Sequence, residues 1–215
     1  RCSRDWSSDV CSSDLLDMVI AVNPALPART LKELIALCKS QPGKFYYGSG
    51  GVAGAPHLAT EQFKALAGID IVHVPYKGGG LAVTGLVSNE VQIMVANMIS
   101  IEPQAKSGRL RALAIAAKSR AALLPDVPTT AEAGMPGYES SQWYGIVAPA
   151  RMPPAIVKTL LGAIERVLAQ PATRQKLATQ GAEPMTETPA EFAAYLKKDI
   201  ADTARVAAAA GVKPE

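Results

Sequence analysis

Two glycine-rich segments of this sequence each join a β-type run to a helix-type run. The first is Phe45-Tyr-Tyr-Gly-Ser-Gly-Gly-Val-Ala-Gly54, before a predicted helix over 56–66. The second is Ile71-Val-His-Val-Pro-Tyr-Lys-Gly-Gly-Gly80, before a predicted helix over 81–87. A helix that begins directly after a strand presents unpartnered N–H groups at the edge of the sheet, and glycine lets a ligand approach the backbone closely. Together, the two turns predict a pocket for a small anion.

The candidate ligand-binding residues lie in these turns and at the end of a third predicted strand: Ser49, Gly50, Gly51, Val52, Ala53, His57, Tyr76, Gly78, Gly79 and Asn97. One helix terminus stabilises an anion by only about 0.3–1 kcal/mol at an exposed site, or ~2 kcal/mol when partly buried. A micromolar ligand needs about 8 kcal/mol, so both turns and several hydrogen bonds must converge on it. The alternative for the first turn is a plain flexible connection.

Four side chains near the turns each allow two interpretations. His57 is either a donor at the pocket rim or a packing histidine whose ring bonds the backbone of the turn. His73 lies among valines, which favours a buried neutral imidazole. Tyr76 either bonds the ligand or lines the cleft, and for Lys77 a solvated position is favoured over ligand contact.

Other chemistries find little support in the sequence. Gly48, Gly50 and Gly51 do not form the G-x-G-x-x-G dinucleotide fingerprint. A nucleophile elbow around Ser49 would need glycine where Tyr47 stands. The two histidines and three cysteines are scattered without metal-ligand spacing. We therefore expect no catalysis, no cofactor and no metal.

Composition limits the possible partners. Of the 215 residues, 48% are hydrophobic and 19% are charged, with a net charge of +3 that is not clustered. No basic run of the kind that binds nucleic acid occurs, and no apolar run reaches the roughly 18 residues of a membrane span. Cys38 lies on the apolar face of a predicted helix, where a buried inert thiol is expected.

The elements that must position the turns alternate between strand and helix patterns. Strand patterns are followed by helix patterns in the order 16–23, 30–40, 45–47, 56–66, 71–74, 81–87, 91–95, 101–106 and 110–116. The helix over 56–66 is expected to turn Leu58, Phe63 and Leu66 inward, and the strand over 71–74 to be buried. This alternation predicts a mostly parallel sheet with helices on both faces.

Capping boxes mark three further helix starts. They are Thr30-Leu-Lys-Glu33, Thr129-Thr-Ala-Glu132 on a short helix ended by Gly134, and Thr188-Pro-Ala-Glu191. A strand is expected over 144–147. The last part of the chain is predicted to be helical over 154–170, 172–179 and 189–210.

The first fifteen residues read RCSRDWSSDVCSSDL and have no amphipathic period and no signal-peptide core. They are similar to peptides translated from sequencing-adapter DNA; the alternative is a flexible polar tail. Either origin predicts that residues 1–15 make no sheet or core contact. The native sequence would then begin near Leu16.

One ordered set of motifs resembles a known family. His73-Val-Pro-Tyr-Lys-Gly78 is similar to the signature of the Bug family of periplasmic solute-binding proteins. Other segments agree in order and spacing, among them Val22-Asn-Pro24, Leu124-Pro-Asp-Val-Pro-Thr129, Trp143-Tyr-Gly145 and Gln180-Gly-Ala-Glu183. The resemblance implies an α/β, periplasmic-binding-protein-like (type II) two-lobed fold. It also implies a periplasmic receptor, monomeric at full length, that passes a small carboxylate to the membrane subunits of a tripartite tricarboxylate transporter without catalysis.

The resemblance also implies a division of the chain. Residues 16–141 would form the second lobe, and residues 142–215 would supply the crossover strand and C-terminal helices of a first lobe whose N-terminal part precedes this chain. The apolar stripe of these C-terminal helices (Ile156, Leu160, Ile164 and Leu168) would then be partly uncovered. Trp143 would wall the cleft or pack the hinge, and Ala96 stands where the family often has an aspartate. The alternative function is the effector-binding domain of a transcription regulator, which shares the two-lobed architecture.

Overall fold

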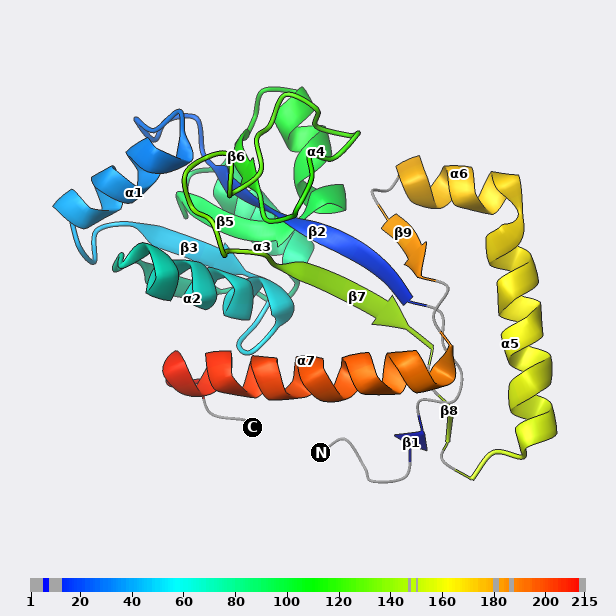
Figure 1. Ribbon diagram of the computed structural model, residues 1–215. Helices are drawn as coiled ribbons and strands as arrows, with labels where there is room; N and C mark the ends of the chain where they lie inside the picture. Colours follow the sequence, from blue (N-terminus) through cyan, green and yellow to red (C-terminus); the bar gives the residue numbers. More distant parts are fainter. Residues whose placement is uncertain are drawn as a thin grey trace. The chain divides into compact units, whose positions relative to one another are not determined.

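The computed structural model describes residues 6–7, 13–146, 148–149, 151–179, 182–185 and 188–212 (Figure 1). The chain divides into two compact units. The sheet unit comprises Asp17–Gln142 and the residues after Ala204, and the helical unit comprises Trp143–Ala204 and the residues up to Leu16.

Five strands make up the main path through a seven-stranded sheet, in the order β4-β3-β5-β2-β6, and two short strands pair with β2 off this path. The five strands of the path are β2 (Ser13–Val22), β3 (Tyr46–Ser49), β4 (Val72–Pro75), β5 (Ile93–Asn97) and β6 (Arg111–Ile115). β3 is parallel to β4 and β5, whereas β2 is antiparallel to β5 and β6. The sheet is thus mixed, whereas a mostly parallel one was predicted: β3, β4, β5 and β6 run in one direction and end at the same edge, and β2 runs in the opposite direction between β5 and β6.

The core lies on both faces of β2, whose side chains alternate between two clusters. Met18, Ile20 and Val22 pack in one cluster with residues of α1 (Leu31–Ser40) and α2 (Ala55–Ala67). Val19 and Ala21 pack in the other with residues of α3 (Gly79–Val87) and α4 (Met98–Lys106). Because successive side chains of a strand point to opposite faces, a continuous apolar strand needs helices on both sides.

Two of the predicted capping boxes begin helices. Thr30 Oγ1 accepts a hydrogen bond of 3.2 Å from the Glu33 N–H at the start of α1. Thr188 Oγ1 accepts one of 3.3 Å from the Glu191 N–H at the start of α7 (Pro189–Ala209). Each replaces a hydrogen bond that the first turn of a helix cannot make internally.

The third capping box forms its hydrogen bonds without a helix. The Glu132 N–H donates to Thr129 Oγ1 over 3.2 Å, but the backbone there follows turns, so the predicted short helix is wrong. The Thr130 N–H donates instead to the Ile115 carbonyl of β6 over 2.8 Å, and Gly134 adopts a φ of +90°. The Ala133 N–H donates to the Thr129 carbonyl over 2.9 Å, so a single turn forms before Gly134 ends it in the left-handed region.

Burial differs from the prediction in α2 and β4. Phe63 of α2 is buried, but Leu66 is 56% exposed, and the inward face carries His57 and Thr60 instead. Val72 of β4 is exposed because β4 is the edge strand of the sheet, so the predicted burial of the strand over 71–74 is wrong there. Cys38 is buried as expected, and burial raises the pKa of its thiol to about 11.

The helical unit contains α5 (Pro154–Ala169), α6 (Pro171–Thr179) and most of α7. Short strands accompany them: β1 (Trp6–Ser7) pairs with β8 (Ala148–Pro149), and residues 13–16 of β2 pair with β9 (Ala182–Met185). β7 (Ser141–Gly145) covers residues 144 and 145 of the strand predicted over 144–147 and begins three residues earlier. The expectation that residues 1–15 make no sheet contact is therefore wrong for residues 6–7 and 13–15, and the rest of that segment lies outside the described residues.

α5 has an open apolar face. None of its residues is buried, and Ile156, Leu160 and Val167 are exposed. Ile164, Val167 and Leu168 also line a groove of about 440 Å³ with Tyr144 and Ile146. The expectation of a partly uncovered stripe holds for Ile156 and Leu160. Within the described ranges, no helix is both long and apolar enough to cross a bilayer.

Replacing Leu160 and Val167 of α5 together by glutamate should reduce binding of an apolar dye to this chain by about twofold or more, because contiguous exposed apolar surface is what such dyes bind. Dye fluorescence measures the effect, with circular dichroism to verify the helix content. Thr159→Glu, an exposed position of the same helix, is the control. Equal fluorescence in the double variant and the parent would show that the dye binds elsewhere.

Candidate functional site

The two glycine-rich turns pack directly against each other at the carboxyl ends of β3 and β4. The Gly78 N–H donates to the Gly50 carbonyl over 3.1 Å, and the Tyr76 N–H donates to the Ser49 carbonyl over 2.9 Å. A Cβ placed on Gly50 would lie 2.7 Å from the Gly79 nitrogen and 3.0 Å from the Gly78 carbonyl carbon. Only glycine at position 50 permits this approach, which joins the turns into one platform.

The second turn also presents an open helix start. A Cβ on Gly79 or Gly80 would meet no atom within 4 Å, so both residues border open space. Gly78 is the N-cap of α3 with a φ of +117°, and the helix carries no acidic residue in its first turn. The first N–H groups of a helix have no intrahelical acceptor and carry its positive dipole end. This corner of the platform can therefore receive an anion.

His57 supports the first turn from beneath. Its Nδ1 accepts a hydrogen bond of 2.9 Å from the Ala53 N–H, and the residue is only 5% exposed. Ala53 has a φ of 60°, an uncommon conformation for a residue other than glycine, which this bond stabilises. Of the two interpretations of His57, the structure shows the packing histidine. The Ala53 N–H, predicted to face a ligand, is already engaged.

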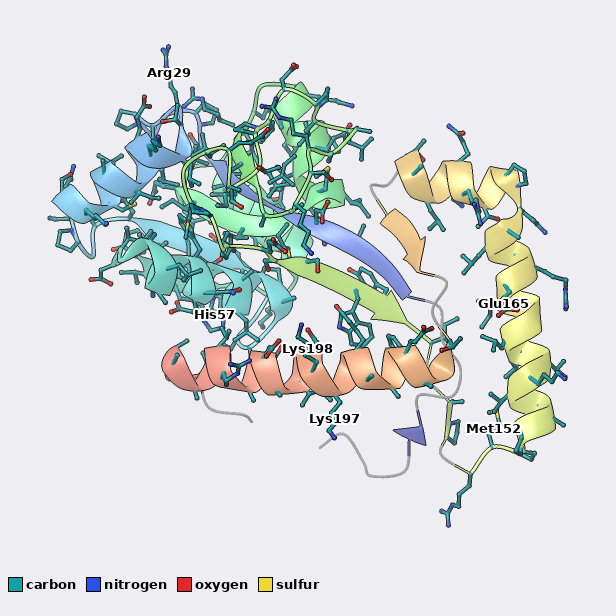
Figure 2. The ribbon with its side chains drawn as sticks, in the orientation of Figure 1. Arg29, His57, Met152, Glu165, Lys197 and Lys198 are labelled. Carbon is teal, nitrogen blue, oxygen red and sulfur yellow. The ribbon has the colours of Figure 1, made fainter. Side chains whose placement is uncertain are left out.

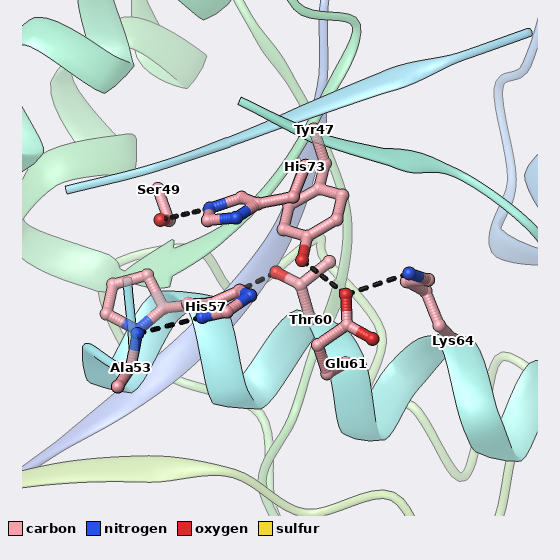
Figure 3. A network of polar contacts seen from close by, with 9 residues as sticks. Tyr47, Ser49, Ala53, His57, Thr60, Glu61, Lys64 and His73 are labelled. Carbon is pink, nitrogen blue, oxygen red and sulfur yellow. Dashed lines mark hydrogen bonds and ion pairs between the residues drawn. The ribbon is translucent and has the colours of Figure 1, made fainter. Parts of the chain in front are cut away.

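Three rings form a stack below the turn (Figure 3). The His73 ring lies 3.9 Å from that of His57 and 4.8 Å from that of Tyr47, measured between centroids. Tyr47 and His73 are paired residues of β3 and β4, and His57 projects from α2 (Figure 2). His73 Nε2 lies 2.7 Å from the hydroxyl of Ser49, which also donates to the Gly51 carbonyl over 2.9 Å. Ser49 is fully buried, so its side chain holds the turn instead of facing open space.

The surroundings of the stack favour neutral imidazoles. Burial lowers the pKa of His57, and burial followed by the nearby His57 lowers the pKa of His73 to about 4. The Tyr47 hydroxyl bonds Glu61, which forms an ion pair of 2.8 Å with Lys64. Burial and Glu61 raise the pKa of Tyr47 far above its usual range. His73 was predicted to be buried and neutral; it is half-buried, and its lowered pKa favours the neutral form.

Tyr76 and Asn97 have polar partners of their own. The Tyr76 hydroxyl donates to Glu90 over 3.0 Å, and the ring lies close to Gly48 and Gly85. Asn97 Oδ1 accepts from the Ser100 N–H over 3.1 Å and so caps α4 at the same edge of the sheet. Both side chains thus have a structural role that the sequence did not reveal.

Apolar side chains border the turns on the solvent side. Val52 is 54% exposed and Leu81, in the first turn of α3, is 55% exposed. Lys77 is also exposed. Val52 is among the predicted ligand-binding residues and Leu81 is not, although a leucine directly after a glycine run that begins a helix indicates a position beside the turns. Among the described residues, no group of histidine, cysteine, aspartate or glutamate could hold a metal ion.

Comparison with known proteins gives consistent matches along the chain. The family described as "Tripartite tricarboxylate transporter family receptor" matches residues 8–212. BugT of Bordetella pertussis is 35% identical over 91% of this chain and 60% of its own length. An R. palustris protein solved with adipate has a TM-score of 0.90 and 30% identity, covering 98% of this chain and 70% of that one. MatC of Rhodopseudomonas palustris, solved with bound malate, has a TM-score of 0.82 and 28% identity, with coverages of 90% and 67%.

The chain spans only part of these relatives. The alignments reach 60% and 61% of the length of two Bordetella pertussis proteins, BugT and a second relative. The match covers both units of the chain, including the two glycine-rich turns.

Two glycine-to-alanine substitutions should have opposite consequences for stability. Gly50→Ala places a methyl group against the Gly79 backbone and should destabilise the protein by about 1–3 kcal/mol. Gly79→Ala adds a methyl group in open space at a helical position, so the free energy of unfolding should stay the same or rise by up to about 1 kcal/mol. Urea denaturation measures both. A Gly50→Ala protein as stable as the parent would show that the turns can separate without cost.

Proposed function

We propose a function from one premise: this chain belongs to the tripartite tricarboxylate transporter receptor family. The function is capture of a small carboxylate outside the cytoplasmic membrane, in the periplasm, and its delivery to the membrane subunits of a transporter. Binding is reversible and involves no catalysis. The full-length receptor acts as a monomer.

The contact between the two turns is the observation that carries this proposal. Gly50 against Gly78 and Gly79 brings two strand-to-helix connections to one corner of the sheet edge. In open α/β sheets, ligands bind outside the carboxyl ends of the strands. The first turn of α3 faces open space there and can donate backbone N–H groups to a carboxylate.

The surroundings of the corner favour a ligand with a short apolar body. Val52 and Leu81 expose aliphatic side chains beside the turns, and the only charged side chain of the two glycine-rich segments is Lys77. Adipate and malate, named with two similar structures, are both small dicarboxylates. We propose the same ligand class for this chain, held mainly by backbone N–H groups.

We propose that the two parts of the chain belong to different lobes of the receptor. We assign residues 16–141 to the second lobe of the receptor and residues 142–215 to the crossover strand and C-terminal helices of the first lobe. The two compact units change over at nearly the same positions, after Leu16 and after Gln142. They differ at the C-terminus, where the residues after Ala204 group with the sheet unit.

The experiment that tests the proposal is calorimetric titration of the full-length protein with adipate, malate and adipamide. Adipamide matches adipate in length but carries no charge, so it should bind at least about tenfold more weakly than adipate, about 1.4 kcal/mol. Equal binding of adipate and adipamide, or binding of neither dicarboxylate, would overturn the carboxylate function.

Gly79→Ala should weaken dicarboxylate binding by about tenfold, because its methyl group enters the space where the ligand approaches the α3 backbone. Calorimetry measures the loss, and thermal melting verifies the fold. Gly162→Ala, another helical glycine whose added methyl group meets no backbone atom, is the matched control and should bind as the parent does. Unchanged affinity in Gly79→Ala would exclude the start of α3 from the site.

A further inference from the structure

The first turn is held by a histidine acceptor that functions only when it is neutral. The Ala53 N–H donates to His57 Nδ1 over 2.9 Å, so this nitrogen must carry a lone pair. A proton on Nδ1 would place two donors against each other. Ala53 would then lose the bond that stabilises its φ of 60°.

His73 contacts the same turn as a hydrogen-bond donor, whereas His57 is an acceptor. The Ser49 hydroxyl has one hydrogen, which can donate to the Gly51 carbonyl at 2.9 Å. His73 Nε2, at 2.7 Å, then acts as the donor to Ser49 Oγ, an arrangement that satisfies all three groups. Protonation of His73 at its other nitrogen would leave this bond intact. The two histidines thus differ: the His57 bond is sensitive to a proton, and the His73 bond is not.

The groups around the pair do not stabilise a charged His57. Its ring is stacked on His73 of β4 at 3.9 Å, so a proton on one imidazole opposes a proton on the other. Tyr47 and Ser49 of β3 are neutral neighbours. On α2, Glu61 favours the charged form and Lys64 opposes it, and the two are paired at 2.8 Å. Burial adds to the cost of charge.

We propose that His57 is a positioning residue of the ligand-binding turn, and that proton uptake by His57 releases Ala53 and weakens ligand capture. This inference rests on the proposed function, because it concerns the same turns. His73, through Ser49, positions the other side of the turn at every pH in the working range.

The direction of the pH effect follows from the shift of His57. Its pKa in the native protein lies below the unperturbed value, so the unfolded or released turn binds the proton more readily. The positioned turn is therefore fully favoured above about pH 6.5 and loses stability as the pH falls from there toward the native pKa.

The test compares the pH dependence of wild-type protein with two matched variants. In His57→Asn, the amide oxygen can take the place of Nδ1 as acceptor but does not titrate. In His73→Gln, the amide nitrogen can take the place of Nε2 as donor. Calorimetry with adipate and malate, and NMR of the Ala53 amide and the histidine rings in ligand-free protein, are recorded from pH 7.5 to pH 5.

We expect the wild-type affinity to fall by about threefold or more over this range, and the Ala53 amide shift to follow the His57 ring. His57→Asn should keep its affinity within about twofold and show no Ala53 titration, because its acceptor remains at every pH. His73→Gln should titrate as the wild type does. Protonation of the dicarboxylates affects all variants equally, so only differences between variants count.

The outcomes separate this inference from the proposed function. A parallel loss of affinity in wild type and His57→Asn, or an Ala53 amide that ignores the His57 titration, would overturn the positioning role. If neither dicarboxylate binds but the Ala53 amide follows His57 in wild type and His73→Gln and not in His57→Asn, the positioning role stands and the carboxylate function fails.

Discussion

The candidate site depends on one close approach, that of Gly50 to the backbone of Gly78 and Gly79. Its origin lies in the topology, because β3 and β4 are parallel neighbours and their following helices pack in the clusters on opposite faces of the sheet. The connections must therefore diverge from adjacent strand ends, about 4.8 Å apart, with no side chain between them. Along the sheet, the chain steps from β3 to β4 and then back past β3 to β5, which is the kind of reversal where doubly wound sheets bind ligands. The corner of the site is thus a consequence of strand order as much as of glycine content.

The stack of Tyr47, His73 and His57 makes this corner rigid without using charge. A positive residue beneath the turn would attract an anion, but burying it would require a partner or cost several kcal/mol. Neutral imidazoles avoid that cost and still provide one acceptor for Ala53 and one partner for Ser49. The ion pair of Glu61 and Lys64 contacts the stack through Glu61, which accepts a hydrogen bond from the Tyr47 hydroxyl. Side chains thus support the turn, and under the proposed function ligand binding would fall to backbone groups.

Much of this fold could be predicted from the sequence, because the signals were local. Neighbouring residues alone define three of these signals: the cap at Thr30, the glycine runs and the apolar run of β2. The structure contains the corresponding elements. The wrong predictions have two causes. The segment after Thr129 stops at a single turn because Gly134 is left-handed. Leu66 is exposed because α2 turns the face with Ala59 and Phe63 toward the core. For the site, the sequence predicted which turns would meet, but not that the Ala53 N–H would be engaged by a residue four positions later.

Engagement of Ala53 changes which groups can supply the binding energy. With Gly78 donating to Gly50 and Ala53 to His57, two of the predicted N–H donors are part of the support. If the proposed site holds a carboxylate, the start of α3 would supply up to ~2 kcal/mol as a partly buried helix terminus, and a hydrogen bond to a charged group would add about 1.5–3 kcal/mol. Two such bonds with the helix terminus approach the roughly 8 kcal/mol of a micromolar complex only at the upper limit of these values. Contact of an aliphatic ligand body with Val52 and Leu81 would add the difference at about 25 cal/mol per Å² of apolar surface buried. At the proposed site, a carboxylate with too short a body would lack this contribution, so the exposed rim of the turns would select for ligand length and the α3 start for charge.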